Sequence, residues 1–455
     1  MFKISKDKNF YHTMLHLMIP ICLQNVLFMT LNMCDTLMLG MMESGAEIAI
    51  NSAGLANQPF FIYSLVIFGM VSGSSVLISQ YWGAGDRKMI NKVAGIALSI
   101  VVAVGLIVTL VVFFFSRGVL RIFSGEAEVI ENGALYIRIV IFSYIPAALT
   151  NMLNGIMRSM EKVKVALFSN TVGVGINILL NYCMIFGKFG FSQMGLKGAA
   201  YATLIARLIE CSIVVVYVFI AERDIRLKPI PIFKCEIHDI RRILKISMPV
   251  VLNETLWSTG VTMYAVILGN MGVAQYAAYS VANIIERIGM VFSQGMANAG
   301  AIIIGKTVGA GKKDKAYEYS GTMLLLTTCA GAVLCVLIIL SRGLFVSIFE
   351  IDDATKEMAK AIIAFVGFVV LCKSYNMVSI VGVLRGGGDI RYAMLCDVLP
   401  MWLLSIPLSF ALSKYTSLSV EYIYCALLVP DEIIKAVAGL IRFKSKKWIK
   451  NITIE

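Results

Sequence analysis

One carboxylate stands alone in the most apolar part of the chain. Asp35 lies inside an almost unbroken apolar run from Met14 to Met42, and no basic residue in that run can pair with it. A charge at the centre of a membrane-length helix costs about 2.5–3.5 kcal/mol on insertion scales, so it is rarely there without a use. We therefore expect Asp35 to face a polar cavity and to bind a cation or a proton.

The second half of the chain carries its own charged and aromatic candidates within apolar segments. Glu254 and Asp397 are acidic residues there, and Glu254 is expected either to attract cationic substrates or to pair with a charge such as Lys373. Trp257 and Tyr264 follow Glu254 on the same segment and could stack on a cation.

Other buried charges are expected to neutralise one another. Glu286 is followed directly by Arg287, and Arg207 lies three residues before Glu210. Because an unpaired charge is costly in an apolar environment, both couples are predicted to be structural ion pairs.

The elements that position these residues must be membrane helices. Of the 455 residues, 58% are hydrophobic and 15% are charged, and the mean hydropathy is +0.82. Soluble chains are less apolar and more charged, so this is a polytopic membrane protein of the all-α class. Twelve segments are long enough to cross the bilayer. They are 14–40, 50–80, 93–115, 134–157, 165–187, 198–221, 246–269, 278–304, 319–340, 359–384, 392–413 and 421–442.

The net charge of +12 is unevenly distributed along the chain. The odd-numbered turns 41–50 and 270–277 lack Lys and Arg, whereas the even-numbered turns and both ends are basic. This is the positive-inside pattern, which predicts a multi-pass protein of the cell (plasma) membrane with both termini in the cytoplasm. The pattern disfavours a nucleic-acid partner.

The two halves of the sequence repeat at an offset of 225 to 229 residues. Gly83-Ala84-Gly85 is echoed by Gly309-Ala310-Gly311, and Arg158 with its preceding Gly155 is echoed by Arg385 with Gly382. Six helices per copy give both copies the same orientation, so we expect two pseudo-symmetric six-helix bundles related by a parallel repeat. The predicted domains are an N-terminal lobe at 1–221, a cytoplasmic linker at 222–245 and a C-terminal lobe at 246–455.

No motif in the sequence points to an enzyme, and the protein is not expected to be one. The Gly-Ala-Gly loops do not continue into the Gly-Lys-Ser/Thr of a phosphate loop, and the ten cysteines are scattered without paired spacing. No cofactor is expected. Energy for transport would then come from an ion gradient or from a substrate moving downhill.

The chain resembles the multidrug and toxic compound extrusion (MATE) transporters over essentially its full length. The residues that carry the resemblance are Pro20 with Asp35, Thr36 and Gly40, then Gln80–Asp86, Asn154–Arg158, Asn177–Asn181, Gly195–Thr203, Leu384–Asp389, and Asp431 with Glu432 and Lys435. The resemblance implies export of bulky, often cationic small molecules in exchange for Na⁺ or H⁺, and the family suggests a monomer.

The resemblance also implies a coupling site in the N-terminal lobe. Asp35 matches the carboxylate of that site, Asn177 and Asn181 match two further members, and Asn154 and Thr203 fall where the family has other polar partners. Oxygen ligands of this kind suit Na⁺, a hard cation. Some family members have an aspartate where this chain has Asn181. A single carboxylate with amides favours Na⁺, or competition of Na⁺ with a proton, over a proton shared by two carboxylates.

The repeat partner of Asp35 is Tyr264, so the C-terminal lobe is not expected to build the same site. Pro20 is the expected hinge of the first helix during alternating access, because proline removes a backbone hydrogen bond. A lipid-linked oligosaccharide flippase of the wider superfamily is the main alternative. It would need a cavity rich in Arg and Lys, for which only Arg207, Arg287 and Lys373 are available. A channel or a membrane enzyme is disfavoured, because neither a filter-like loop nor a His-rich centre is present.

Overall fold

The computed structural model describes residues 4–222, 227 and 236–454, and within these residues the chain is helical without β-strands. The first half contains α1 (Lys8–Gly40), α2 (Ala46–Ala84), α3 (Arg87–Phe114), α4 (Ser116–Arg121), α5 (Ala127–Val140), η1 (Ile141–Ser143), α6 (Tyr144–Ser159), α7 (Lys164–Phe186), α8 (Leu196–Val216) and η2 (Tyr217–Ala221). The second half contains α9 (Ile237–Gly269), α10 (Val273–Gly309), α11 (Lys313–Val346), α12 (Asp353–Met377), η4 (Val378–Arg385), α13 (Ile390–Pro400), η5 (Met401–Ser405), α14 (Ile406–Tyr415) and α15 (Val420–Lys444).

Several of these elements join end to end into longer continuous helices, here called rods. The segments α5–η1–α6, α8–η2, α12–η4 and α13–η5–α14 run without a break in the chain, so the described residues form twelve long rods, each overlapping one predicted span. Ten rods are long and apolar enough to cross a membrane; α9 and α15 are the other two. The predicted all-α membrane fold is confirmed.

Local sequence signals explain where several helices begin and end. Asp86 caps α3 by accepting a hydrogen bond from the backbone N–H of Met89, and Asp352 caps α12 through Thr355. Gly187 ends α7 with a left-handed backbone, at a φ of 67° that favours glycine. The π-helical turn η5 follows directly after Pro400, whose ring cannot continue regular α-helical hydrogen bonding.

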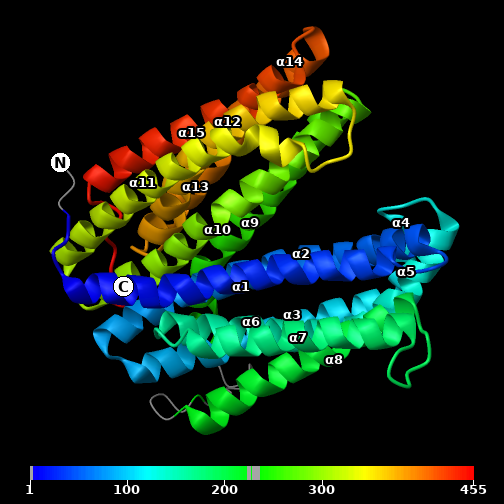
Figure 1. The fold of residues 1–455 in the computed structure, drawn as a ribbon. Coiled ribbons are helices and arrows are strands. Elements are labelled where there is room, and N and C mark those ends of the chain that lie inside the picture. Colours follow the sequence, from blue (N-terminus) through cyan, green and yellow to red (C-terminus); the bar gives the residue numbers. More distant parts are fainter. Residues whose placement is uncertain (1–3, 223–226, 228–235, 455) are drawn as a thin grey trace. The chain divides into compact units, whose positions relative to one another are not determined.

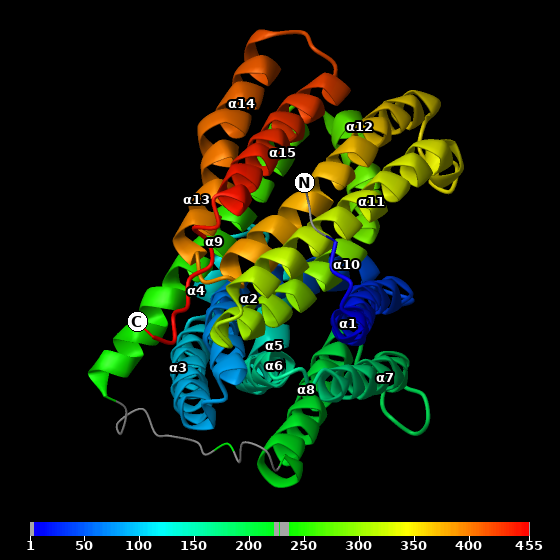
Figure 2. The same ribbon diagram turned by 90° about the vertical axis from the view of Figure 1, so that its left-hand side faces the viewer.

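The chain forms two compact units. Unit 1 comprises Met1–Cys22, Ser79–Gly85 and Leu252–Glu455, and unit 2 comprises Leu23–Ile78 and Asp86–Val251. In unit 2, α7 packs against α8, and in unit 1, α11 packs against α12 (Figures 1 and 2). Half of the predicted linker, at 223–226 and 228–235, lies outside the described residues, and the predicted lobe boundaries stay a prediction.

Three long helices belong partly to one unit and partly to the other. The change falls between Cys22 and Leu23 in α1, between Ile78 and Ser79 in α2, and between Val251 and Leu252 in α9. In α1 and α9 the second unit begins three residues after a proline, Pro20 or Pro249.

The internal repeat is visible in how the helices pack. A Cβ on Gly83 would lie 1.9 Å from the Lys306 carbonyl oxygen, and a Cβ on Gly309 would lie 1.9 Å from the Gln80 carbonyl oxygen. The ends of α2 and α10 therefore approach through two glycines in a reciprocal arrangement, and both contacts lie in unit 1. The repeated Gly-Ala-Gly loops thus mark a close backbone contact.

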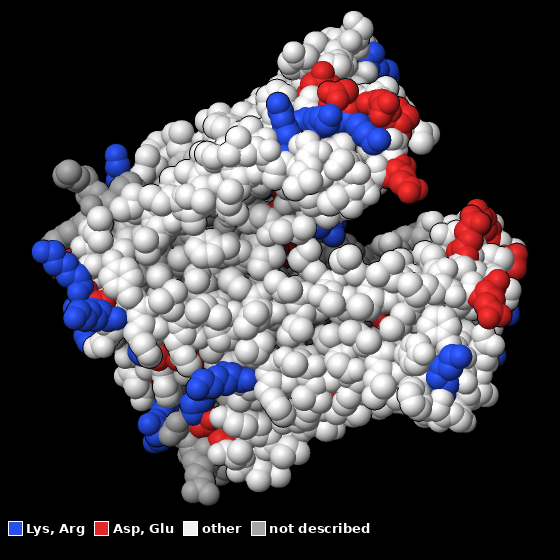
Figure 3. All heavy atoms as spheres, viewed as in Figure 1, with Lys and Arg blue, Asp and Glu red and all other residues white. Residues whose placement is uncertain are grey.

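Charged side chains gather towards the helix ends, and the surface along the helices is mostly uncharged (Figure 3). Many large apolar side chains are exposed along that surface, including Ile107, Leu179 and Val336. Such a surface suits lipid. Both ends of the chain are fastened to unit 1: Asp7 accepts a hydrogen bond from Tyr319 at 2.6 Å, and the carbonyl of Lys450 accepts one from Gln80 at 3.1 Å.

Candidate functional site

The predicted coupling residues meet in unit 2. The side-chain amide of Asn181 on α7 donates one hydrogen bond to Oδ1 of Asp35 at 2.6 Å and another to Oδ1 of Asn177 at 3.0 Å. Asn177 lies one turn earlier on α7 and is 3.5 Å from the Thr203 hydroxyl on α8. The structure therefore brings four of the five predicted residues into one hydrogen-bonded chain that joins α1, α7 and α8.

The orientation of the Asn181 amide follows from its neighbours. Both Asp35 Oδ1 and Asn177 Oδ1 accept hydrogen bonds, so the Asn181 nitrogen must point towards them. This leaves the Asn181 oxygen buried without a hydrogen-bond partner among the described residues. A buried amide oxygen without a donor is a ready ligand for a hard cation.

Asn154, the fifth predicted residue, lies on α6 and is also buried. Within the described part of the chain its side-chain oxygen has no hydrogen-bond partner, so the hydrogen-bonded chain does not extend to this oxygen. Asn154 and Asn181 thus each have a buried amide oxygen in unit 2 that lacks a hydrogen-bond donor among the described residues.

Two residues that the sequence analysis did not assign to this site also belong to its surroundings. The side chain of Tyr136 on α5 is buried, hydrogen-bonds Thr203 and Asn57, and interacts electrostatically with Asp35. Arg207 on α8 attracts the Asp35 carboxylate and also pairs with Glu210 at 3.0 Å, which confirms that predicted ion pair. No periodic pattern marks Tyr136 in the sequence.

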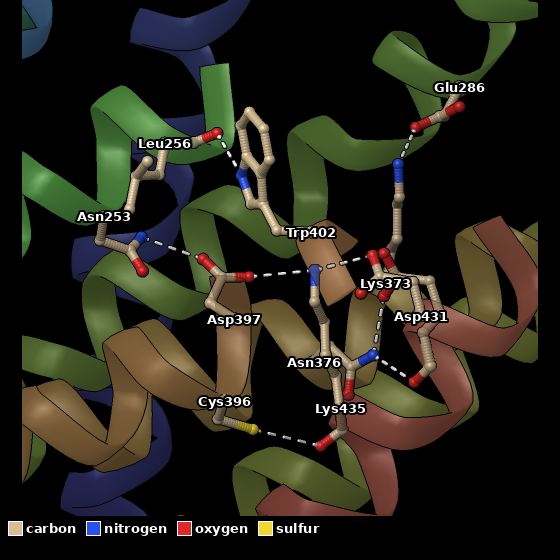
Figure 4. A network of polar contacts seen from close by, with 11 residues as sticks. Asn253, Leu256, Glu286, Lys373, Asn376, Cys396, Asp397, Trp402, Asp431 and Lys435 are labelled. Atoms are coloured by element: carbon tan, nitrogen blue, oxygen red, sulfur yellow. Dashed lines mark hydrogen bonds and ion pairs between the residues drawn. The ribbon is translucent and has the colours of Figure 1, made fainter. Parts of the chain in front are cut away.

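Unit 1 contains a second buried polar network, formed by α9, α12, α13 and α15 (Figure 4). The Lys435 ammonium lies 2.9 Å from Asp431 and 3.2 Å from Asp397, so one cation contacts two carboxylates. Asn253 donates to Asp397 at 3.0 Å, and Asn376 donates to Glu432 at 2.7 Å. Asp397 is thus part of a charge network and is not an isolated acid.

Two predicted pairings in unit 1 are wrong. Glu254 pairs with Arg385 at 2.9 Å and not with Lys373. Lys373 instead pairs with Glu286 at 2.5 Å, which removes Glu286 from its expected partner Arg287. Adjacent residues on a helix point in different directions, so a pair at i and i+1 seldom closes. Arg287 donates a hydrogen bond to Asn283.

The remaining predicted residues have distinct surroundings. Trp257 on α9 is 42% exposed, whereas Tyr264 on the same helix is buried and its hydroxyl has no partner among the described residues. Stacking on a substrate stays a prediction for both. Pro20 lies within α1, which continues as one helix through it.

No group of three or more His, Cys, Asp and Glu residues with the geometry of a metal site occurs in the described chain. The oxygen atoms around Asp35 that could bind a cation belong to amides and a hydroxyl, and such oxygens are characteristic of sites for hard monovalent and divalent cations.

The sequence matches the family model MatE in two blocks, residues 20–183 and residues 249–411. Each block covers most of one sequence repeat. The match includes Asp35, Asn154, Asn177 and Asn181 in the first block and Glu254 and Asp397 in the second.

The chain is similar to curated proteins over nearly their whole length, and these include proteins named as transporters or multidrug resistance proteins. A probable multidrug resistance protein NorM of Thermotoga maritima is 26% identical over 446 residues, which are 97% of this chain and 94% of that protein. The uncharacterized transporter YisQ of Bacillus subtilis is 25% identical over 451 residues, covering 98% of this chain and 96% of that protein.

Solved structures share the fold. A crystal structure of MATE in the bent conformation superposes with a TM-score of 0.87 at 19% identity, covering 98% of this chain and 99% of that one. An outward-facing multidrug resistance MATE family transporter superposes with a TM-score of 0.85 at 18% identity, with the same coverage. At this level of identity the likeness concerns the fold alone.

Proposed function

Because the chain belongs to the MatE family of membrane transporters, we propose that it is a cation-coupled antiporter for bulky, often cationic small molecules. The coupling ion is Na⁺ or H⁺, and it binds at Asp35 in unit 2. The names of similar proteins, which include multidrug resistance proteins, support drug or toxic-metabolite export. The proposed location is the cell membrane, with both termini cytoplasmic and the protein acting as a monomer.

The observation that carries the proposal is the contact between Asp35 and Asn181. The Asn181 amide nitrogen donates a hydrogen bond to Oδ1 of the Asp35 carboxylate at 2.6 Å, and the oxygen of the same amide has no donor among the described residues. A cation arriving here would gain carboxylate and amide oxygens at once. A proton arriving on Asp35 would instead remove the charge that the Asn181 amide now stabilises. Either ion changes the interactions between α1 and α7, so ion binding can bias the conformation.

The boundary inside α1 supports Pro20 as the hinge. Asp35 lies in the part of α1 that belongs to unit 2, whereas Pro20 lies in the part that belongs to unit 1. Since Pro20 removes one backbone hydrogen bond of the helix, a bend there costs less than elsewhere in α1. Ion binding at Asp35 would thereby be transmitted along α1 to the proline.

The flippase alternative is less well supported. A pyrophosphate carrier needs several unneutralised basic groups facing the substrate. Arg207 pairs with Glu210, and Lys373 pairs with Glu286, so two of the three available residues already serve a carboxylate.

The test is efflux of ethidium from proteoliposomes under a Na⁺ gradient alone and then under a proton gradient alone. We expect the wild-type protein to export the dye under one of the two gradients and Asp35→Asn to export none. The matched control is Glu128→Gln, which neutralises an exposed carboxylate on α5 in the same unit and should leave efflux unchanged. Normal efflux by Asp35→Asn would disprove coupling at this residue. Absence of dye export by the wild type under both gradients would favour the flippase.

A further inference from the structure

The polar network of unit 1 contains more carboxylates than cations. The pairs Glu286–Lys373 and Glu254–Arg385 are balanced. The remaining group, which we call the Lys435 cluster, consists of Asp397, Asp431 and Lys435, together with Glu432, which also attracts Lys435. With every carboxyl ionised, the Lys435 cluster would carry a net charge of −2 between membrane helices. Such a charge is too costly to persist without a further positive charge.

The three carboxylates of the Lys435 cluster are stabilised to very different degrees. Asp397 receives a hydrogen bond from Asn253 in addition to its contact with Lys435, and Glu432 receives one from Asn376. Asp431 is completely buried and lies 2.9 Å from Lys435, and within the described structure no amide donates a hydrogen bond to either of its oxygens. Asp431 is therefore the one carboxylate of the cluster that lacks an amide donor among the described residues.

An unpartnered hydroxyl lies among these charges. Tyr264 on α9 is 4% exposed, its hydroxyl has no hydrogen-bond partner among the described residues, and it interacts electrostatically with all four members of the Lys435 cluster. A buried hydroxyl seldom lacks a partner.

The internal repeat relates this arrangement to the Asp35 site. Tyr264 corresponds to Asp35, and at an offset of 228 residues Asp431 corresponds to Thr203 and Lys435 to Arg207. In unit 2 the carboxylate is on the first helix of the repeat and the hydroxyl is on the last. In unit 1 the two are exchanged, and a basic residue one turn after the second position is kept in both. The C-terminal repeat was not expected to build the same site, and it holds the same groups with their places exchanged.

We infer that the Lys435 cluster is a second ion-binding site, separate from Asp35, and that it binds a proton carried by Asp431. Protonation of Asp431 lowers the net charge of the cluster from −2 to −1. When Asp431 loses this proton, the resulting carboxylate is stabilised by the Lys435 ammonium 2.9 Å away.

The geometry favours a proton over a metal ion. The Lys435 ammonium already lies between Asp397 and Asp431, at the position that a bound cation would need. The charged groups facing Asp431 come from α15 (Glu432 and Lys435) and α13 (Asp397), with Tyr264 from α9. Farther out, Lys373 on α12 attracts Glu432, and Arg385 on η4 attracts Asp397. A metal ion would be repelled by Lys435 and would find few free oxygen ligands.

The test detects the protonated carboxyl directly and does not depend on transport. Infrared spectra of the purified full-length protein in lipid nanodiscs are recorded at neutral and alkaline pH, with the Asp35→Asn substitution present in every sample. We expect a carbonyl band of a protonated carboxylic acid at neutral pH that is lost at alkaline pH. Asp431→Asn should remove this band. Because Asp35 is absent throughout, failure here is distinguishable from failure of the coupling proposal.

Two further variants make the result decisive. Asp389→Asn is the matched control, because Asp389 is also buried but contacts two cations, Arg442 and Lys450, and should stay ionised. Its substitution should leave the band in place. Tyr264→Phe keeps every carboxyl and should shift the frequency of the band without removing it, which provides an answer even if Asp431→Asn does not fold.

Three outcomes would overturn the inference. The band could persist unchanged in Asp431→Asn, or its frequency could be the same in Tyr264→Phe as in the parent protein. The third outcome is loss of the band on adding Na⁺ at constant pH, with binding of Na⁺ that Asp431→Asn abolishes. That result would assign the site to a metal ion.

Discussion

The side-chain nitrogen of Asn181 lies 2.6 Å from Oδ1 of Asp35, and this hydrogen bond joins α7 to α1 within unit 2. Replacing the amide by a carboxylate changes the ion that the pair can hold. In Asn181→Asp two carboxylates at this separation cannot both ionise, so they would share a proton. We expect dye efflux by this variant to be driven by a proton gradient and to lose any dependence on Na⁺. Efflux that still requires Na⁺ in liposomes without a pH gradient would contradict this expectation.

Asn177 is predicted to act by holding Asn181 in place. Asn177→Ala removes the acceptor at 3.0 Å and the link to Thr203, while the bond from Asn181 to Asp35 can remain. Loss of such a supporting hydrogen bond weakens ion affinity about 10- to 100-fold in comparable sites. The measurement is the ion concentration that gives half-maximal efflux. Asn151→Ala is the control, because its amide donates a hydrogen bond to the Ala147 carbonyl on its own helix, α6.

The ion pair between Arg385 and Glu254 is predicted to matter for stability. Arg385 is 2% exposed, so Arg385→Gln leaves Glu254 without its partner in a largely buried position. Breaking a buried pair from one side costs about 3–5 kcal/mol. We expect a clear fall in the thermal unfolding temperature of the purified protein, and partial recovery when Glu254→Gln is added.

An exposed pair provides the comparison. Arg117 and Glu131 are 2.7 Å apart with side chains 56% and 53% exposed, and a pair of this kind contributes about 0–1 kcal/mol. Arg117→Gln should therefore leave the unfolding temperature almost unchanged. Equal losses in the two variants would refute the argument from burial.

The close approach of α2 and α10 requires glycine. In Gly309→Ala the new Cβ would lie 1.9 Å from the Gln80 carbonyl oxygen, so the two helices must separate. Overpacking usually costs about 1–3 kcal/mol, and a backbone atom cannot rotate away as a side chain can. We expect lower yield of folded protein and a lower unfolding temperature. Gly118→Ala has open space around the new Cβ and should be at least as stable as wild type.

The cap of α12 predicts a pH-dependent contribution to stability. Hydrogen bonds from the Thr355 side chain and backbone hold the pKa of Asp352 below its usual value. A lowered pKa in the folded state means that the stabilisation is present above the pKa of the unfolded chain and is lost as the pH falls through the folded value. The difference in unfolding temperature between wild type and Asp352→Ala should therefore shrink under acidic conditions. A difference that grows with acidification would contradict this sign.

The composition and the repeat were sufficient to predict the all-α membrane fold, and Asp35 could be singled out because a charge in an apolar run is conspicuous. Tyr136 could not be found in the same way. Tyrosine is common in apolar segments, and only the packing of α5 against α8 brings this hydroxyl to Thr203.

Pairing of charges was harder to predict than their presence. The Arg207–Glu210 pair lies within one helical turn and could be read from spacing. The partners of Glu254 and Glu286 are 131 and 87 residues away, on other helices. Sequence separation of this size carries no information on contact, because the choice of partner depends on how the helices rotate and pack.

Gln80 donates to the Lys450 carbonyl and accepts from the Ile452 backbone N–H, and these contacts have a consequence for assembly in the cell. Unit 2 is complete once Val251 has been synthesised. Unit 1 needs the first 22 residues, the short segment 79–85 and the end of the chain together. Translation therefore delivers the two units at different times. The start of α1 and the end of α2 therefore reside in the membrane without the other parts of unit 1 until the last helices have been synthesised.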